Sequence, residues 1–130
     1  MLKHGQVCWA ELATDDLAGA KSFYSDLFGW NFKGGDANTG APREYAEFRL
    51  GDDYPMGGMY QKPPEMPAPP HWMTYVAVDD VDAAAAKAAE LGGSVKVPPM
   101  DIPNVGRFAV LTDPSGETLA IVKLLEHGEA

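Results

Sequence analysis

Cysteine is nearly absent from this chain of 130 residues, which contains Cys8 and no other. One cysteine cannot form an internal disulfide, and it excludes every zinc site that requires several cysteines. Apolar runs are short, and none approaches the ~20 residues of a membrane-spanning helix. Basic residues are few, 10 against 19 acidic ones, so the formal net charge is −9. Nucleic acids and membranes are therefore not expected as partners, because both are bound through clustered Lys and Arg.

The remaining composition is that of a folded, globular protein. Hydrophobic residues make up 45% and charged residues 22%, which excludes a wholly disordered chain. A chain of this length is expected to form a single domain. The first six residues, Met-Leu-Lys-His-Gly-Gln, lack the apolar stretch of a signal peptide. With the single cysteine, this predicts a cytoplasmic protein.

Hydrophobic periodicity predicts two helices and eight strands. The helices are expected over 16–28 and 81–91, each preceded by an Asp-Asp pair suited to capping. Gly57 and Gly58 interrupt one strand and indicate a bulge or a close approach to another group. Loops are expected over 34–42 and 98–106. The strands are expected over 6–13, 30–33, 43–50, 54–61, 72–78, 95–97, 107–112 and 118–124.

The two halves of the chain resemble each other when one is shifted by 64 residues, the separation of Asp16 from Asp80. Between them, residues 62–70 contain five prolines and cannot form regular structure. We therefore predict one domain, residues 1–130, built as module one (about 4–61), a linker (62–70) and module two (about 71–125). The identical pairs are Ala13, Asp15, Asp16, Ala20, Leu27 and Gly29 with Ala77, Asp79, Asp80, Ala84, Leu91 and Gly93.

Each module is predicted to run strand–helix–strand–strand–strand, which leaves a concave face for a ligand between the two modules. Alternation divides the first strands of the modules into two sets, but the pattern does not decide which set faces the ligand. One set contains Cys8, Ala10, Leu12, Trp72, Thr74 and Val76, and the other contains Trp9, Glu11, Ala13, Met73, Tyr75 and Ala77.

Four motifs resemble a known family. They are the run from Trp9 to Asp16, the pair Phe23-Tyr24, the segment Leu27-Phe28-Gly29-Trp30 and the run from Phe108 to Gly116. Together they resemble the glyoxalase/bleomycin-resistance/dioxygenase (vicinal oxygen chelate) superfamily, in particular a branch of glyoxalase-related proteins of unknown activity. The resemblance implies an α+β fold in which two tandem βαβββ modules form a cupped mixed β-sheet with helices on the convex side. It also implies a homodimer.

The resemblance further implies where a metal would be bound. Metal-binding members place His, Gln or Glu on the first and last strand of each module. Counted from the Asp-Asp caps and the Asp-Pro-Ser-Gly turn, these positions fall at Trp9, Met73 and Ala120, with the fourth near Gly58 or Met59. None of these side chains binds a hard divalent ion. We therefore predict no metal and no cofactor; the alternative is a divalent metal bound in a shifted alignment, which would use Glu11 and His71.

The candidate functional residues are those that could line the concave face. Glu11 is a candidate proton carrier, because a carboxylate among apolar groups can act as general acid or base; the alternative is a surface or dimer-contact carboxylate. The predicted function is binding of a small, largely apolar or aromatic molecule between the modules. The alternative is a metal-dependent or Glu-assisted lyase or isomerase of the lactoylglutathione lyase-related kind. The candidate ligand-binding residues, which could equally be core or surface residues, are Trp9, Met73, Tyr75, Met59 and Arg107.

Overall fold

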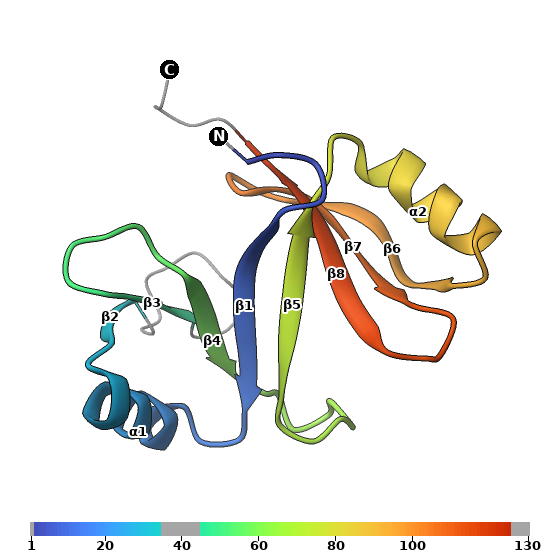
Figure 1. The fold of residues 1–130 in the computed structure, drawn as a ribbon. Coiled ribbons are helices and arrows are strands. Elements are labelled where there is room, and N and C mark those ends of the chain that lie inside the picture. The colour runs from blue at the N-terminus through green and yellow to red at the C-terminus, as the bar shows by residue number, and fades with distance from the viewer. Residues whose placement is uncertain (1, 35–44, 126–130) are drawn as a thin grey trace. The chain divides into compact units, whose positions relative to one another are not determined.

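A computed structural model describes residues 2–34 and 45–125, and the chain divides into two compact units. The first unit is Trp9–Met73, and the second combines Met1–Cys8 with Thr74–Ala130. Within the described residues, each unit carries one helix and a mixed sheet (Figure 1). The predicted α+β fold with two βαβββ modules is confirmed. No helix in this part of the chain is long and apolar enough to cross a membrane.

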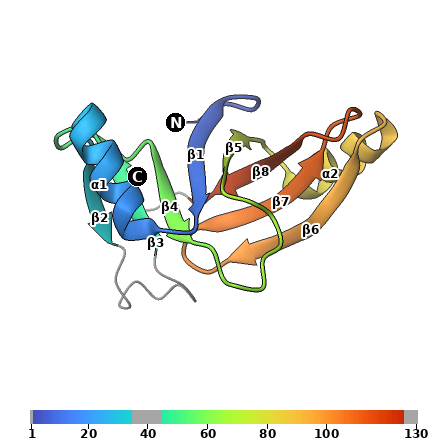
Figure 2. The same ribbon diagram turned by 90° about the horizontal axis from the view of Figure 1, so that it is seen from below.

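The sheet of the first unit has the strand order β2-β3-β4-β1. Strands β1 and β4 pair in parallel, whereas β3 pairs antiparallel with both β2 and β4. Helix α1 makes the crossover that follows β1 (Figure 2). The bounds are β1 (Val7–Thr14), α1 (Leu17–Phe28), β2 (Asn31–Gly34), β3 (Tyr45–Arg49) and β4 (Gly57–Gln61).

The second unit repeats this topology with the order β5-β8-β7-β6. Strands β5 and β8 pair in parallel, and β7 pairs antiparallel with β8 and β6. The same order and the same pairing directions are what a duplicated module predicts. The bounds are β5 (His71–Ala77), α2 (Val81–Glu90), β6 (Ser94–Ile102), β7 (Gly106–Thr112) and β8 (Thr118–Leu124).

The helix N-termini follow the sequence repeat, but the C-termini do not. Asp16 and Asp80 each accept a hydrogen bond from the backbone N–H three residues on, at 2.9 and 3.0 Å, as expected for capping residues. Gly29 ends α1 with φ +78, the left-handed conformation that glycine adopts without strain. In the second unit the left-handed glycine is Gly92 and not the aligned Gly93, because α2 is shorter.

The first part of one predicted loop belongs to a strand. Residues 98–106 were expected to be irregular because of their prolines, but β6 extends from Ser94 to Ile102. Pro98 and Pro99 lie in this edge strand, whose register against β7 shifts twice, between Val95 and Val97 and between Val97 and Met100. An edge strand with bulges tolerates proline, because a missing N–H need not interrupt the pairing inside the sheet. Residues 62–70 contain no helix or strand, as predicted; the predicted loop 34–42 lies outside the described residues except for Gly34.

Each helix covers one face of its own sheet, which we call the helix face; the opposite side is the free face. In the first unit, Trp30 stacks on Phe48 with ring centroids 4.2 Å apart. Trp72 contacts the same rings edge-on, so it lies on the helix face. The buried cluster under α1 contains Leu12, Leu17, Ala46, Phe48 and Met59, and the one under α2 contains Val78, Val81, Ala85, Ala109, Leu111 and Ile121.

These clusters settle the question of faces that alternation left open. Leu12 lies on the helix face of β1, so Trp9 and Glu11 lie on the free face, because side chains alternate along a strand. On β5, Trp72 lies on the helix face, which places Met73 on the free face of the first unit. Tyr75 pairs with Ala120 beside the helix-face residue Ile121, and so lies on the free face of the second unit.

Candidate functional site

Three side chains on the free face of the first unit form a hydrogen-bonded group. The indole N–H of Trp9 on β1 donates to the hydroxyl of Tyr45 on β3, with 2.8 Å between Nε1 and the oxygen. The Tyr45 hydroxyl donates in turn to Oε2 of Glu11, also at 2.8 Å. All three side chains are half-buried. We call these residues the Trp9–Tyr45–Glu11 group.

Gly58 creates the room for this group. It lies on β4 between Glu11 on β1 and Glu47 on β3, its pairing partners. A Cβ at this position would collide with the ring and hydroxyl of Tyr45. The absence of a side chain therefore lets the Tyr45 ring lie across β4 and reach Glu11. The close approach expected at Gly58 is confirmed.

The group combines apolar ring surface with a fixed polar end. Trp9 and Tyr45 supply aromatic faces suited to stacking, and Tyr45 also stacks on Tyr60 with centroids 6.4 Å apart and planes at 13°. The Tyr45 hydroxyl holds one oxygen of Glu11 in a defined orientation. Such an arrangement can bind an aromatic molecule, and its carboxylate can accept a hydrogen bond or a proton from that molecule.

A second carboxylate lies on the same face but is already paired. Glu47 Oε1 is 3.2 Å from Nη2 of Arg49, two residues along β3. Arg49 is the more buried partner, since 21% of its side chain is exposed against 42% for Glu47. The charge of Glu47 is therefore balanced within the strand.

The metal positions implied by the resemblance do not carry ligands for a divalent ion. The pair Glu11–Gly58 corresponds to Tyr75–Ala120, so Gly58 is the structural counterpart of Ala120. Trp9 presents an indole ring and Met73 a thioether, while Ala120 and Gly58 present a methyl group and a hydrogen atom. Hard divalent ions instead require oxygen or imidazole ligands. Among residues 2–34 and 45–125, no three His, Cys, Asp or Glu side chains are grouped as a metal site.

The shifted alignment stays an untested alternative. Its second ligand, His71, has Nδ1 2.8 Å from the carbonyl oxygen of Pro69, and because a carbonyl can only accept, this contact places the proton on Nδ1. Cys8 is half-buried, and this burial raises the pKa of its thiol. A raised pKa keeps the thiol protonated and unreactive near neutral pH.

The prediction for Met59 was wrong. This side chain is 0% exposed and lies in the buried cluster under α1, on the opposite face of the sheet from Glu11. Gly58, its neighbour in β4, is the residue on the free face.

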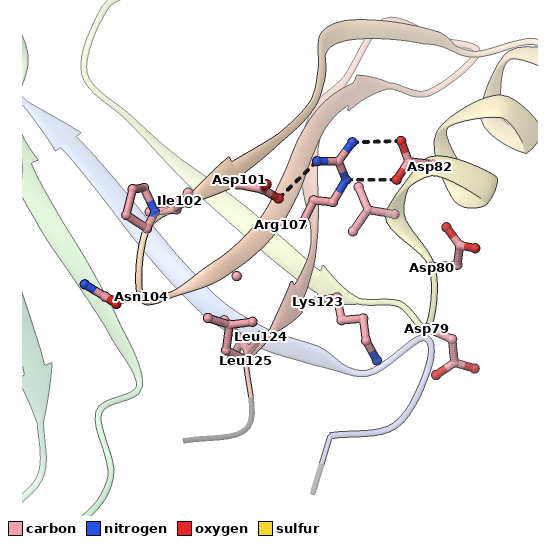
Figure 3. A pocket seen from close by; sticks show the side chains of 13 residues that line it. Asp79, Asp80, Asp82, Asp101, Ile102, Asn104, Arg107, Lys123, Leu124 and Leu125 are labelled. Carbon is pink, nitrogen blue, oxygen red and sulfur yellow. Dashed lines mark hydrogen bonds and ion pairs between the residues drawn. The ribbon is translucent and has the colours of Figure 1, made fainter. Parts of the chain in front are cut away.

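Arg107 also lies on the helix face of its sheet, where it contacts Asp82 of α2 (Figure 3). Its guanidinium holds both carboxylate oxygens of Asp82 on α2, at 2.8 and 2.9 Å, and one oxygen of Asp101 on β6, at 3.0 Å. The hydrogen bonds from Arg107 lower the pKa of Asp82, and both carboxylates raise the pKa of Arg107. These two acidic partners balance the charge of the guanidinium, and because it lies on the helix face, Arg107 does not line the free face where the ligand was expected.

Arg107 borders an open depression of about 570 Å³ in the second unit. The start of α2 and strands β6, β7 and β8 surround it (Figure 3). Its wall combines apolar side chains such as Ile102 and Leu124 with the acidic side chains of Asp79 and Asp80. None of the residues of the Trp9–Tyr45–Glu11 group lines it.

Sequence reasoning placed Trp9 and Glu11 in the site but missed Tyr45. Alternation along the predicted strand 43–50 groups Tyr45 with Glu47 and Arg49, and Gly58 was recognised as a site of close approach. The missing information was the register of β3 against β4 and β1, which places Tyr45 over Gly58.

Comparison with known proteins gives consistent matches. The family model of the glyoxalase/bleomycin resistance protein/dioxygenase superfamily matches residues 6–121. "Putative glyoxylase CFP32" of Mycobacterium bovis is 43% identical over 119 residues, which cover 92% of this chain and 44% of that protein. Anthracycline biosynthesis protein DauV of a Streptomyces species is 37% identical over 122 residues, covering 94% and 42%. The chain thus spans less than half the length of either relative.

Solved structures share the fold. Methylmalonyl-CoA epimerase from Mycobacterium tuberculosis superimposes with a TM-score of 0.65 at 15% sequence identity, over 97% of this chain and 94% of that one. At this identity the match extends to the fold alone.

Proposed function

Because this chain belongs to the glyoxalase/bleomycin resistance protein/dioxygenase superfamily, we propose that it binds a small, largely apolar or aromatic molecule without a metal at the family positions. The observation that carries the proposal is the Trp9–Tyr45–Glu11 group on the free face of the first unit. It places the indole of Trp9 at one of the family's metal positions, with the Tyr45 ring and the Glu11 carboxylate hydrogen-bonded beside it. A homodimer and a cytoplasmic location stay predictions from the sequence.

The class of ligand follows from the shape and polarity of these side chains. Planar rings stack on indole and phenol faces through dispersion and electrostatic attraction. The excess of acidic residues, with a net charge of −9, favours neutral or cationic ligands over anions. Two relatives of this chain are named anthracycline biosynthesis proteins, and anthracyclines contain flat, fused aromatic rings.

Titration with the neutral, planar probe 1,8-dihydroxyanthraquinone tests the proposal. We expect Trp9→Ala to weaken binding roughly tenfold or more, since the loss of one aromatic contact of about 1.4 kcal/mol changes Kd by that factor. Tyr54→Ala is the matched control, because Tyr54 is an aromatic residue of the same unit with 93% of its surface exposed. Isothermal titration calorimetry gives both values. Equal affinity of the two variants, or no binding by the unmodified protein, would contradict the proposal.

A second candidate function is Glu-assisted isomerase or lyase chemistry. The hydrogen bond from Tyr45 favours it, because a catalytic carboxylate must be held in one orientation to receive a proton from a substrate. In this case Glu11 would take a proton from the carbon next to a carbonyl group and return it to the neighbouring atom.

Glu11→Gln separates catalysis from binding. With the hemithioacetal of methylglyoxal and glutathione as substrate, we expect this variant to lose activity by about 100-fold or more if Glu11 is the proton carrier. Glu47→Gln is the control, because Glu47 lies on the same face but is paired with Arg49. Activity that survives in Glu11→Gln and depends on added Mn²⁺ or Zn²⁺ would exclude this role and support the metal-dependent alternative.

A further inference from the structure

We infer that Trp9 and Glu11 form a recognition site for a hydroxyl group on an aromatic ring, and that Tyr45 occupies this site in the free protein. This inference rests on the proposed function and specifies its ligand class. The Tyr45 side chain is itself a phenol, and its hydroxyl accepts from Trp9 Nε1 and donates to Glu11 Oε2, each at 2.8 Å. A phenolic ligand in the same place would make the same two hydrogen bonds.

The bonding pattern is selective for a hydroxyl group. Trp9 can only donate through its indole N–H, and an ionised Glu11 can only accept. The group between them must therefore accept and donate through one atom, which a hydroxyl does and a carbonyl oxygen or an aromatic C–H does not. An anionic ligand would lie against the negative charge of an ionised Glu11 carboxylate, which disfavours it. A neutral hydroxyaromatic molecule meets all of these conditions.

The position is also built to receive a flat ring. Gly58 leaves the surface of β4 open below the Tyr45 ring, since any Cβ there would collide with that ring. Tyr60, stacked on Tyr45 with nearly parallel planes, borders the same position. A ligand ring that replaced the ring of Tyr45 would keep the floor at Gly58 and the contact with Tyr60.

The inference requires that the Tyr45 ring leaves this position while β3 stays paired with β4. The Tyr45 side chain is half-buried, and the backbone of β3 pairs with β4 independently of the ring. A rotation about the Cα–Cβ bond would move the ring away and break its hydrogen bonds to Trp9 and Glu11. For a ligand with such a hydroxyl group, Tyr45 is a competitor and not a stacking partner, so its removal is expected to increase the affinity for that ligand.

The test uses p-cresol, the free molecule that corresponds to the tyrosine side chain. In the Tyr45→Ala variant, we expect p-cresol to bind at least tenfold more tightly than toluene, which has a similar shape but no hydroxyl group. The hydroxyl of p-cresol can replace the two hydrogen bonds that Tyr45 makes to Trp9 and Glu11, and toluene cannot. The unmodified protein should bind p-cresol more weakly than the variant does. In the double variant Tyr45→Ala/Glu11→Ala, the preference for p-cresol should fall close to one. Equal binding of p-cresol and toluene by Tyr45→Ala would overturn the inference.

A second measurement uses the unmodified protein and does not depend on the variant being folded. In a titration followed by the ¹H–¹⁵N signal of the Trp9 indole, we expect 2-naphthol to shift the signal and to bind more tightly than naphthalene. If both bind equally and binding depends on Trp9, the proposed function stands and the hydroxyl preference is refuted. If neither binds, while the dihydroxyanthraquinone also fails, the proposed function itself is refuted.

Discussion

Replacing Phe48 with alanine is expected to lower the free energy of unfolding by about 3–5 kcal/mol. Phe48 is 2% exposed and lies in the buried cluster under α1. Its ring stacks on Trp30 at 4.2 Å with the planes only 5° apart, and it meets Phe32 and Trp72 at 6.4 and 6.0 Å. Alanine would remove all of these contacts and leave a cavity that rigid neighbouring rings cannot fill.

Urea unfolding of both proteins measures this loss. Tyr54→Ala is again the matched control, because an aromatic side chain with 93% of its surface exposed should change stability by less than about 0.5 kcal/mol. A loss below 1 kcal/mol in Phe48→Ala would show that the aromatic cluster rearranges to fill the space. The effect also concerns the site, because Phe48 and Glu47 are consecutive residues on opposite faces of β3.

The elements that could be predicted from the sequence are those with local signals. The Asp-Asp pairs located both helix starts because a capping side chain bonds to a backbone group only three residues away. Strand 118–124 was predicted with the bounds that the structure shows. The extent of β6 could not be predicted in this way, because whether proline is tolerated depends on its place at a sheet edge, which is a property of the tertiary structure.

The alternation of side chains was informative where the two faces of a strand differ. On β1 it separated two sets without showing which one faced the ligand, and the structure places the set with Trp9 and Glu11 on the free face. On β4, the sequence Gly-Gly-Met-Tyr-Gln is buried on both sides over four of its five residues, so no polar alternation distinguishes Gly58 from Met59. Arg107 was misplaced because its acidic partners, Asp82 and Asp101, come from other elements, and their positions depend on tertiary packing.

The final prediction concerns the two neighbouring glycines of β4, which serve different purposes. Gly57 pairs with Ala10 of the parallel strand β1, and a Cβ at Gly57 would collide with the carbonyl oxygen of Ala10 and lie 2.6 Å from a ring carbon of Phe48. The carbonyl belongs to the backbone and cannot rotate away. The three atoms nearest to a Cβ at Gly58 all belong to the far end of the Tyr45 side chain, which can move.

We therefore expect Gly57→Ala to cost about 3 kcal/mol in the free energy of unfolding, because the sheet must separate where β1 and β4 pair. Gly58→Ala should cost clearly less, because the Tyr45 ring can turn away, although Trp9 and Glu11 would then lose their hydrogen bonds to its hydroxyl. In a Tyr45→Ala background, the remaining cost of Gly58→Ala should fall close to zero, whereas that of Gly57→Ala should not change. Urea unfolding measures the change in the free energy of unfolding for each glycine substitution, in the unmodified protein and in Tyr45→Ala. A larger loss of stability for Gly58→Ala than for Gly57→Ala would contradict the assignment of Gly57 to strand pairing and of Gly58 to the site.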